Sequence, residues 1–343
     1  MPWRASPPLA LVLLAVAVVA AVLAASASGA VSIPLRELPA LLWGTPTPEQ
    51  ALWRNVLIDI RLPRVLLAVV MGAGLAISGA ALQALFRNPL ADPYLLGSSA
   101  GASLGVAVML FFLGISPAST VLALRVGMTG AAFVGSVGAV LLTLLLARGV
   151  EQTLRLLLAG VVVGVVLGSG TALLTLINID VMRTMQSFML GSTGFLGWNS
   201  VLVLAASLAL GGVLALGCSR GLDALSLGEA TARSLGVRLA LLRLLLIAAM
   251  SLSTAAAVAQ CGLVAFVGLV APHLVRSWGT VTHGALLVLA PLTGGALLLA
   301  ADVAARWIIA PQELPVGIIT ALLGGSYLLW LMHRRHHSLG GRA

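Results

Sequence analysis

The sequence contains no lysine, and this absence excludes several kinds of chemistry. All nineteen basic residues are arginines. A phosphate-binding P-loop needs a lysine on the nucleotide phosphates, so the chain cannot carry an ATPase site of that type. A lysine Schiff base is excluded as well. If transport by this protein uses ATP, a separate subunit must bind the nucleotide with its magnesium ion and hydrolyse it.

Charge of either sign is also scarce. Charged residues make up 8% of the 343 residues, whereas 60% are hydrophobic. Soluble globular proteins carry about 25% charged residues, so the composition predicts an integral membrane protein formed by one transmembrane domain over residues 1–343. There are only two cysteines, Cys218 and Cys261, and neither belongs to a CxxC or Cys/His cluster. We expect them to be packing residues and not metal ligands.

Stretches without formal charge predict an all-α fold of ten membrane-spanning helices. At about 20 residues per span, a chain of this length has room for roughly nine to eleven. The stretch Leu244–Pro272 is long enough for two shorter helices, which Gln260 and Gly262 divide at a tight turn and Pro272–His273 ends. The other expected spans are Leu9–Ala27, Leu66–Leu85, Leu95–Ile115, Val126–Ala147, Leu156–Ile179, Phe188–Ser219, Gly284–Ala301 and Leu314–Met332.

An even number of spans places both termini on one side of the membrane. With the N-terminus inside, twelve arginines fall on the inner side and seven on the outer side, which favours cytoplasmic termini. Arg4, an apolar run and Ala25–Ser26–Ala27 also resemble a cleaved signal peptide. The run Leu9–Ala27 is longer than a usual signal core, so we expect a retained first helix.

The position of the carboxylates bears on mechanism. All of them lie in predicted loops or at the ends of spans, including Asp302 and Glu313. An ion-coupled carrier normally places such groups inside its spans, and a membrane enzyme would need His, Asp or Glu clustered at one face. Neither pattern is visible. The stretch Arg220–Arg243 contains an i,i+4 pair, Glu229 and Arg233, and is either an ordinary interfacial segment or a docking element for a cytoplasmic partner.

Several motifs in fixed order resemble the permease subunit of type II ABC importers, the family that takes up cobalamin, iron–siderophore complexes and haem. The resemblance covers nearly the whole chain after the first span. Segments Ala76–Gln83 and Leu252–Gln260 are also similar to each other and would run in opposite directions, as in inverted repeats. The matching motifs are Ile60–Arg64, Ala76–Ala80, Gln83–Pro93, Leu156–Gly160, Leu227–Gly236, Phe266–His273, Ala301–Asp302 with Arg306, and Glu313–Gly317.

The resemblance implies a multi-pass protein of the bacterial inner membrane that works as a homodimer beside two ATPase subunits. A periplasmic or lipid-anchored binding protein would deliver a bulky metal chelate, which alternating access would move into the cytoplasm. The chain itself would be no enzyme and would bind no cofactor or metal. An iron chelate is the preferred cargo because most members serve iron uptake, while siderophore, haem and cobalamin remain open. The alternative is a secondary carrier of a small solute that needs no ATP.

The resemblance also implies three groups of functional residues. Residues 222–236 would form coupling helices in a cleft of the ATPase. Three arginines would face the periplasm and meet acidic groups of the binding protein, and three residues would form a cytoplasmic gate, while the fifth and tenth spans line the pathway. The residues are Leu227, Gly228, Glu229, Ala232, Arg233, Leu235 and Gly236 for coupling, Arg61, Arg64 and Arg306 for docking, and Asn88, Leu90 and Thr153 for the gate.

Overall fold

The computed structural model describes residues 7–29, 33–44, 47–113, 121–148, 153–194 and 196–340, and every regular element in those ranges is a helix. The predicted all-α fold is confirmed there. The long helices are α1 (Pro7–Ala27), α4 (Leu62–Leu85), α5 (Ser98–Leu113), α6 (Val121–Leu146), α7 (Thr153–Ile177), α9 (Trp198–Gly217), α12 (Leu239–Cys261), α14 (His283–Trp307) and α15 (Val316–Gly340). The shorter ones are η1 (Leu35–Glu37), α2 (Leu38–Trp43), α3 (Pro48–Asn55), η2 (Val56–Arg61), α8 (Ile179–Leu190), α10 (Ser219–Ser226), α11 (Glu229–Ser234) and α13 (Val267–Ser277).

Seven helical segments in the described ranges are long and apolar enough to cross a membrane. They contain α1, α4, α6, α7, α9, α12 and α14, whereas α5 and the apolar part of α15 are shorter. Together with α13 these would make the ten expected crossings. Length and composition do not fix the number of crossings, so ten stays a prediction.

Two expected boundaries in the middle of the chain are wrong. The helix expected from Phe188 begins only at Trp198, because the preceding residues belong to α8 and to the connection after it. The turn between α12 and α13 is where the sequence predicts it, but α13 does not end at Pro272 and continues to Ser277. Proline removes one hydrogen bond from a helix, and α13 tolerates this loss because other helices enclose it.

Two further ends are wrong in the last part of the chain. α14 does not stop at Ala301 but continues through Asp302 to Trp307. A carboxylate inside a helix at this depth needs a charged partner, and Asp302 has two, as described below. α15 continues past Met332 to Gly340. The expected span Leu95–Ile115 ends outside the described residues.

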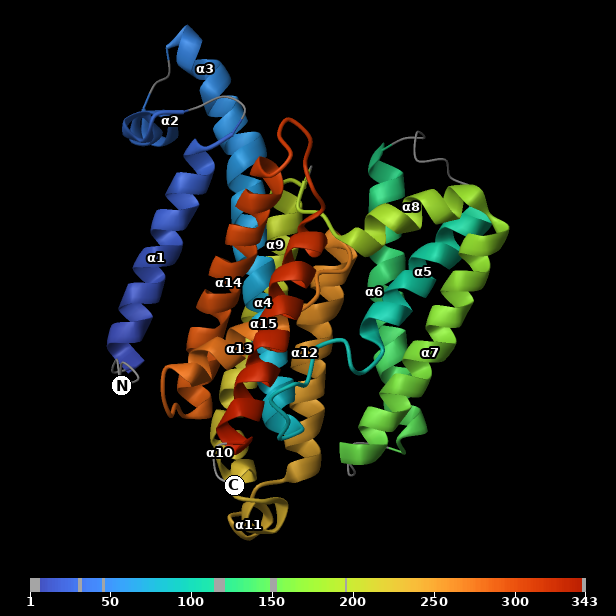
Figure 1. Ribbon diagram of the computed structural model, residues 1–343. Coiled ribbons are helices and arrows are strands. Elements are labelled where there is room, and N and C mark those ends of the chain that lie inside the picture. The colour runs from blue at the N-terminus through green and yellow to red at the C-terminus, as the bar shows by residue number, and fades with distance from the viewer. Residues whose placement is uncertain are drawn as a thin grey trace.

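α4 lies at the centre of the bundle, packed against α9, α12, α13 and α14 (Figure 1). Most of its residues are buried, and many are glycine, alanine or serine, which allow close approach of neighbouring backbones. A methyl group on Gly79 would overlap the carbonyl oxygen of Gly268 in α13. That oxygen lacks its usual helical donor because Pro272, four residues later, has no N–H. Gly72 meets the Gly294 carbonyl of α14 in the same way.

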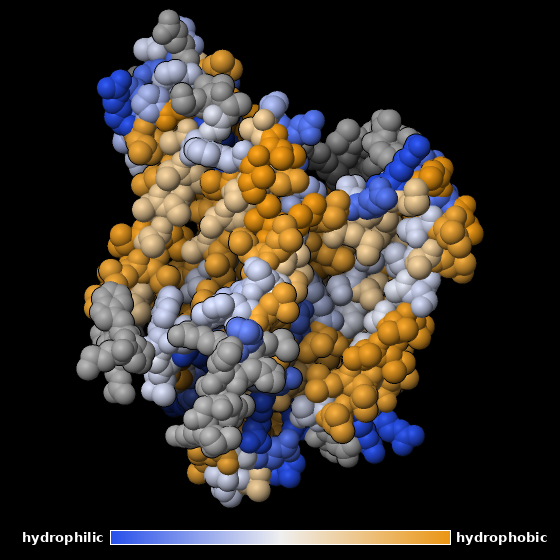
Figure 2. Space-filling view, in the orientation of Figure 1, coloured by the Kyte–Doolittle hydropathy of each residue, from blue (hydrophilic) through white to orange (hydrophobic). Residues whose placement is uncertain are grey.

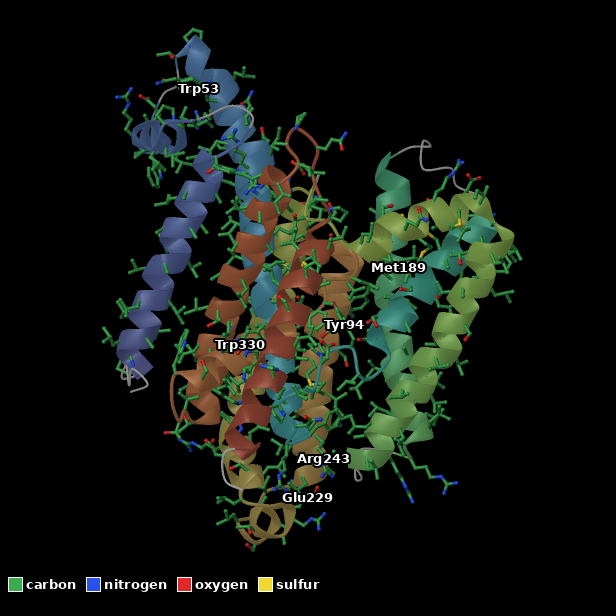
Figure 3. All side chains as sticks on the ribbon, in the orientation of Figure 1. Trp53, Tyr94, Met189, Glu229, Arg243 and Trp330 are labelled. Atoms are coloured by element: carbon green, nitrogen blue, oxygen red, sulfur yellow. The ribbon has the colours of Figure 1, made fainter. Side chains whose placement is uncertain are left out.

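Two non-helical segments interrupt the bundle, one after α4 and one after α12. Residues 86–97 lead from α4 into the short α5, and residues 262–266 lead from α12 into the short α13. α4 and α12 run in opposite directions (Figure 1), as expected of inverted repeats. The hydroxyl of Tyr94 donates to the carbonyl oxygen of Val264 at 3.0 Å, and Tyr94 lies midway between the two ends of the bundle (Figure 3). Irregular backbone at this depth needs such enclosure by protein.

On the face shown in Figure 2, the coloured surface is apolar over much of its middle and most hydrophilic toward the two ends. α7, which packs against α5 and α6, exposes Leu158, Val162, Val166 and Leu173 along its length. Surfaces of this kind require lipid or another chain around them. α1 begins and α15 ends at the end of the bundle that carries α11 (Figure 1). We call this end the α11 end and the opposite one, which carries α2 and α3, the α3 end.

Candidate functional site

At the α11 end, α10 and α11 form a short element outside the bundle, residues 219–236 (Figure 1). α10 is anchored by Leu222 and Leu225, each 1% exposed, which pack into the core. Gly228, with φ of 114°, turns the chain between the two helices, and Gly236, with φ of 81°, follows the end of α11. Glycine adopts positive φ without the strain that other residues meet. These two glycines therefore define the shape of the α10–α11 element.

The α10–α11 element presents two leucines to the outside. Leu227 and Leu235, which flank α11, are 67% and 63% exposed, whereas Ala232 between them is fully buried. Two exposed leucines on a protruding element offer apolar surface to a partner protein. The structure thus brings the predicted coupling residues together in one element.

Glu229 connects the α10–α11 element to α12. Its Oε1 accepts a hydrogen bond from Nη2 of Arg243 at 2.6 Å, and its Oε2 lies 3.4 Å from Nη2 of Arg233. Arg243 is 2% exposed and Arg233 is 64% exposed. Because a short pair with a buried guanidinium is stronger than a solvated one, Arg243 is the principal partner. Glu229 and Arg243 lie beside each other in Figure 3, and their ion pair joins α11 to α12.

A second polar contact joins α10 to the start of α14. Oδ1 of Asp223 accepts a hydrogen bond from the backbone N–H of His283 at 2.9 Å and lies 2.7 Å from His283 Nδ1. Burial acts to raise the pKa of Asp223, but the two contacts with His283 and its charge outweigh this, so the pKa lies below its ordinary value. The carboxylate therefore stays ionised and holds the two helices together.

The predicted gate residues lie on two elements at the α11 end. Asn88 and Leu90 are exposed in the segment after α4, where Oδ1 of Asn88 accepts from the backbone N–H of Leu90 at 3.0 Å. Arg87, just before them, has a left-handed backbone with φ of 50°. Thr153 is the first residue of α7 and is half-buried. Both elements lie at the α11 end, and the gate role itself stays a prediction.

At the α3 end, two of the three predicted docking arginines, Arg64 and Arg306, pair with the fully buried carboxylate of Asp302. Asp302 lies 3.0 Å from Nε of Arg64 and 3.1 Å from Nε of Arg306, and it also accepts from the hydroxyl of Thr193. Arg64 further pairs through Nη1 with Glu313 at 2.8 Å. The arginine side chains are 14% and 10% exposed, whereas Glu313 is 47% exposed. The cluster thus links α4, α14 and the two connections that precede α9 and α15.

Arg61 is directed elsewhere. Its Nη1 donates to the carbonyl oxygens of Ser26 and Ala27 at the end of α1, at 3.1 and 3.0 Å. Arg61 is only 7% exposed. As described here, Arg61 fixes the end of α1 to η2. The docking role of the three arginines stays a prediction, now for side chains that also have partners within the chain.

Four residues of these contacts were not expected as functional residues: Arg243, Asp302, Glu313 and His283. The i,i+4 spacing indicates the Glu229–Arg233 pair, but nothing local indicates that Arg243 is the closer partner. For Asp302 a signal exists, since a lone carboxylate four residues before Arg306 suggests an internal pair. His283 and Asp223 lie 60 residues apart, which no local pattern connects.

The two helices expected to line the pathway, α7 and α15, both expose apolar faces. On α15 the exposed residues include Leu322, Leu323 and Trp330, the last labelled in Figure 3. Such faces suit a large, weakly held cargo or contact with a second chain. Among the described residues no three His, Cys, Asp or Glu side chains gather closely enough to hold a metal ion. Both cysteines are buried and free.

Comparison with known proteins agrees with this geometry. The sequence model of the FecCD transport family matches residues 13–334. The hemin transport system permease protein HmuU of Yersinia pestis is 42% identical over 99% of this chain and 100% of its own length. The vitamin B12 import system permease protein BtuC of Escherichia coli is 39% identical over 84% of this chain and 86% of its own length. A solved metal-chelate type ABC transporter in an inward-facing conformation superposes with a TM-score of 0.82 at 29% identity, covering 94% of this chain and 98% of the other.

Proposed function

Because the chain belongs to the FecCD transport family, we propose that two copies of it, with two ATPase subunits, form the membrane pathway of an importer for a bulky metal chelate. The chain is the permease of such an ABC importer and matches relatives of this kind over nearly its whole length. In this proposal it lies in the inner membrane with the α11 end in the cytoplasm. ATP is bound and hydrolysed on the ATPase subunits.

The α10–α11 element is the observation that carries this proposal. It combines the exposed Leu227 and Leu235 with an ion pair between Glu229 and Arg243 of α12. A partner that binds the two leucines can therefore move α12 through this ion pair. This is what a coupling element must do when closure of an ATPase is converted into alternating access. The predicted coupling residues keep this role.

At the opposite end we assign the binding protein to the surface around Arg64, Arg306 and Glu313. Arg64 and Arg306 lie at this surface beside the buried Asp302 and the exposed Glu313. Charged groups of this kind steer and register a partner of complementary charge more than they hold it. The cargo in this proposal is an iron chelate, haem among them, with cobalamin as the runner-up because BtuC is similar over 84% of the chain.

Co-purification tests the assembly. We expect the tagged chain, extracted in mild detergent, to carry an ATPase at one copy per permease. Leu227→Gln and Leu235→Gln should each reduce ATPase recovery severalfold, because each removes apolar contact area from the proposed interface with the ATPase. Leu52→Gln is the matched control, since Leu52 is 66% exposed on α3 at the other end.

Transport by the reconstituted complex tests the cargo and the energy source. With ATP inside proteoliposomes, uptake of haemin, a ferric siderophore and cobalamin should differ, with one iron chelate preferred. A chain that purifies without an ATPase even after cross-linking, or uptake that needs an ion gradient and no ATP, would establish the secondary carrier instead.

A further inference from the structure

A pocket of about 240 Å³ lies at the α11 end, between the elements that the proposed mechanism must move together. Its walls come from the end of α4, the end of α10, the end of α13 and the start of α14. The remaining wall is the segment after α4, residues 86–97, which carries Asn88 and Leu90 and is called the gate segment here. The volume exceeds that of a single water, which occupies roughly 30 Å³ of the liquid. The lining residues are Gln83, Ala84, Arg87, Pro89, Ser226, Arg276 and His283.

The charges around this pocket are unbalanced. Three of its seven lining residues, Arg87, Arg276 and His283, are cationic or can become so, and none is a carboxylate. Among the described residues, neither Arg87 nor Arg276 takes part in an ion pair. By contrast, Asp302 and Glu313 at the α3 end and Glu229 and Asp223 at the α11 end are each paired with another side chain. The pocket therefore carries positive charge that the described chain does not neutralise.

Arg276 is held in place by a neutral group. Its Nη1 donates to Oε1 of Gln83, and Nε2 of Gln83 in turn donates to the carbonyl oxygen of Leu269 at 3.1 Å. Gln83 is 2% exposed. A buried glutamine fixed at both ends of its amide orients the guanidinium without neutralising it. A guanidinium that is half-buried and oriented in this way is prepared to bind an anion.

His283 completes the donors, whereas the hydroxyl of Ser226 already donates to the carbonyl oxygen of Asp223 at 2.6 Å. Nδ1 of His283 is engaged by Asp223, so Nε2 is the ring nitrogen left for a ligand, and it donates when the ring is protonated. Two guanidinium groups and an imidazole on three different elements suit an anion with several oxygens arranged in three dimensions. A planar carboxylate would occupy one guanidinium and leave the other unmatched.

We infer that this pocket binds a phosphate group, held by Arg276 and Arg87 with His283. The phosphate comes either from the headgroup of an anionic lipid of the inner leaflet or from solution. When bound, it bridges the gate segment, α13 and the start of α14. His283 connects this bridge to the α10–α11 element, because its Nδ1 lies 2.7 Å from Oδ1 of Asp223. Whether phosphate is bound therefore determines how strongly a movement of the α10–α11 element displaces the gate segment. The inference needs neither the ATPase nor the cargo, so its test is independent of the proposed function.

The test uses the full chain without partners and two probes. Inorganic phosphate is titrated by calorimetry in lipid-free detergent at low salt, because salt screens such contacts. Phosphatidylglycerol retention, against phosphatidylcholine, is measured by native mass spectrometry. Arg276→Gln and Arg87→Gln should weaken binding of at least one probe by about tenfold or more, and Arg276→Lys should retain part of it. Arg155→Gln, at an exposed arginine on α7 outside the pocket, should leave binding unchanged.

The outcomes distinguish soluble phosphate from a lipid headgroup as the ligand, and both from the absence of a phosphate site. Binding of phosphate alone assigns a soluble anion, and retention of phosphatidylglycerol alone assigns a lipid headgroup. The inference is overturned if the unaltered chain binds neither probe, or if Arg155→Gln weakens binding as much as Arg276→Gln, because charge anywhere on this face would then suffice. Should Arg276→Gln fail to fold, Arg87→Gln and Arg276→Lys carry the same comparison.

Discussion

Nε of Arg64 lies 3.0 Å from Oδ1 of Asp302, although the two residues are 238 positions apart in the sequence. Asp302 is fully buried, and Arg306 pairs with it from one turn further along α14. The carboxylate thus lies between two guanidinium groups, and this compensation allows α14 to continue past Ala301. An uncompensated charge at this position would disfavour the helix.

Removal of the central charge is therefore expected to be costly. Asp302→Asn leaves Arg64 and Arg306 facing each other without their shared counter-charge, and loss of one partner from a buried pair costs about 3–5 kcal/mol. We expect a clear fall in the unfolding temperature in detergent at a fixed scan rate. Glu313→Gln is the control, because Glu313 is 47% exposed and exposed pairs contribute about 1 kcal/mol or less. Equal effects of the two variants would show that Asp302 is not the centre of the cluster.

Close packing of α4 against α13 gives a second prediction. Gly79→Ala places a methyl group on the Gly268 backbone, which cannot move aside without shifting α13. We expect lower unfolding temperature and lower transport, since overpacking costs typically 1–3 kcal/mol. Gly138→Ala on α6 is the matched control, because a methyl group there meets nothing within 4 Å. A destabilised Gly138→Ala with a normal Gly79→Ala would contradict this packing.

How much the sequence reveals depends on the range of each interaction. The charge-free stretches predict most helices because hydrophobic length is a local property, and the turn at Gln260–Gly262 follows from local composition. The ends of α13 and α14 do not, since Pro272 is tolerated where other helices enclose α13, and Asp302 where Arg64 and Arg306 compensate its charge. The motifs also predict the coupling and gate segments, and these roles stay predictions. They do not predict the partners Arg243 and His283, because each lies at least 14 positions from the carboxylate it binds.

The two partners of Glu229 predict different effects on coupling. Arg243→Gln removes the buried partner and frees α11 from α12, so we expect ATP hydrolysis that no longer responds to binding protein and cargo, with transport reduced severalfold. Arg233→Gln removes a partner that is 64% exposed at 3.4 Å and should change coupling little. Both are measured as stimulated ATPase activity of the reconstituted complex. A larger loss in Arg233→Gln would mean that the solvated pair carries the movement.

The contact between Asp223 and His283 gives a pH dependence whose sign follows from the pKa of the carboxylate. Although burial acts against it, contact with His283 holds that pKa below its ordinary value. The ionised form therefore stabilises the fold at any pH above the unfolded value of about 3.9, and this contribution is lost as the pH falls through the folded pKa. Asp223→Asn keeps an oxygen for the His283 N–H but has no charge. Its unfolding temperature should lie below that of the unaltered chain at pH 6, and the gap should close as the pH falls below about 4. Because Asp223 is 44% exposed, the gap should be small and should shrink in high salt. A gap that is constant from pH 6 to pH 3 would show that shape, and not the charge of Asp223, joins α10 to α14.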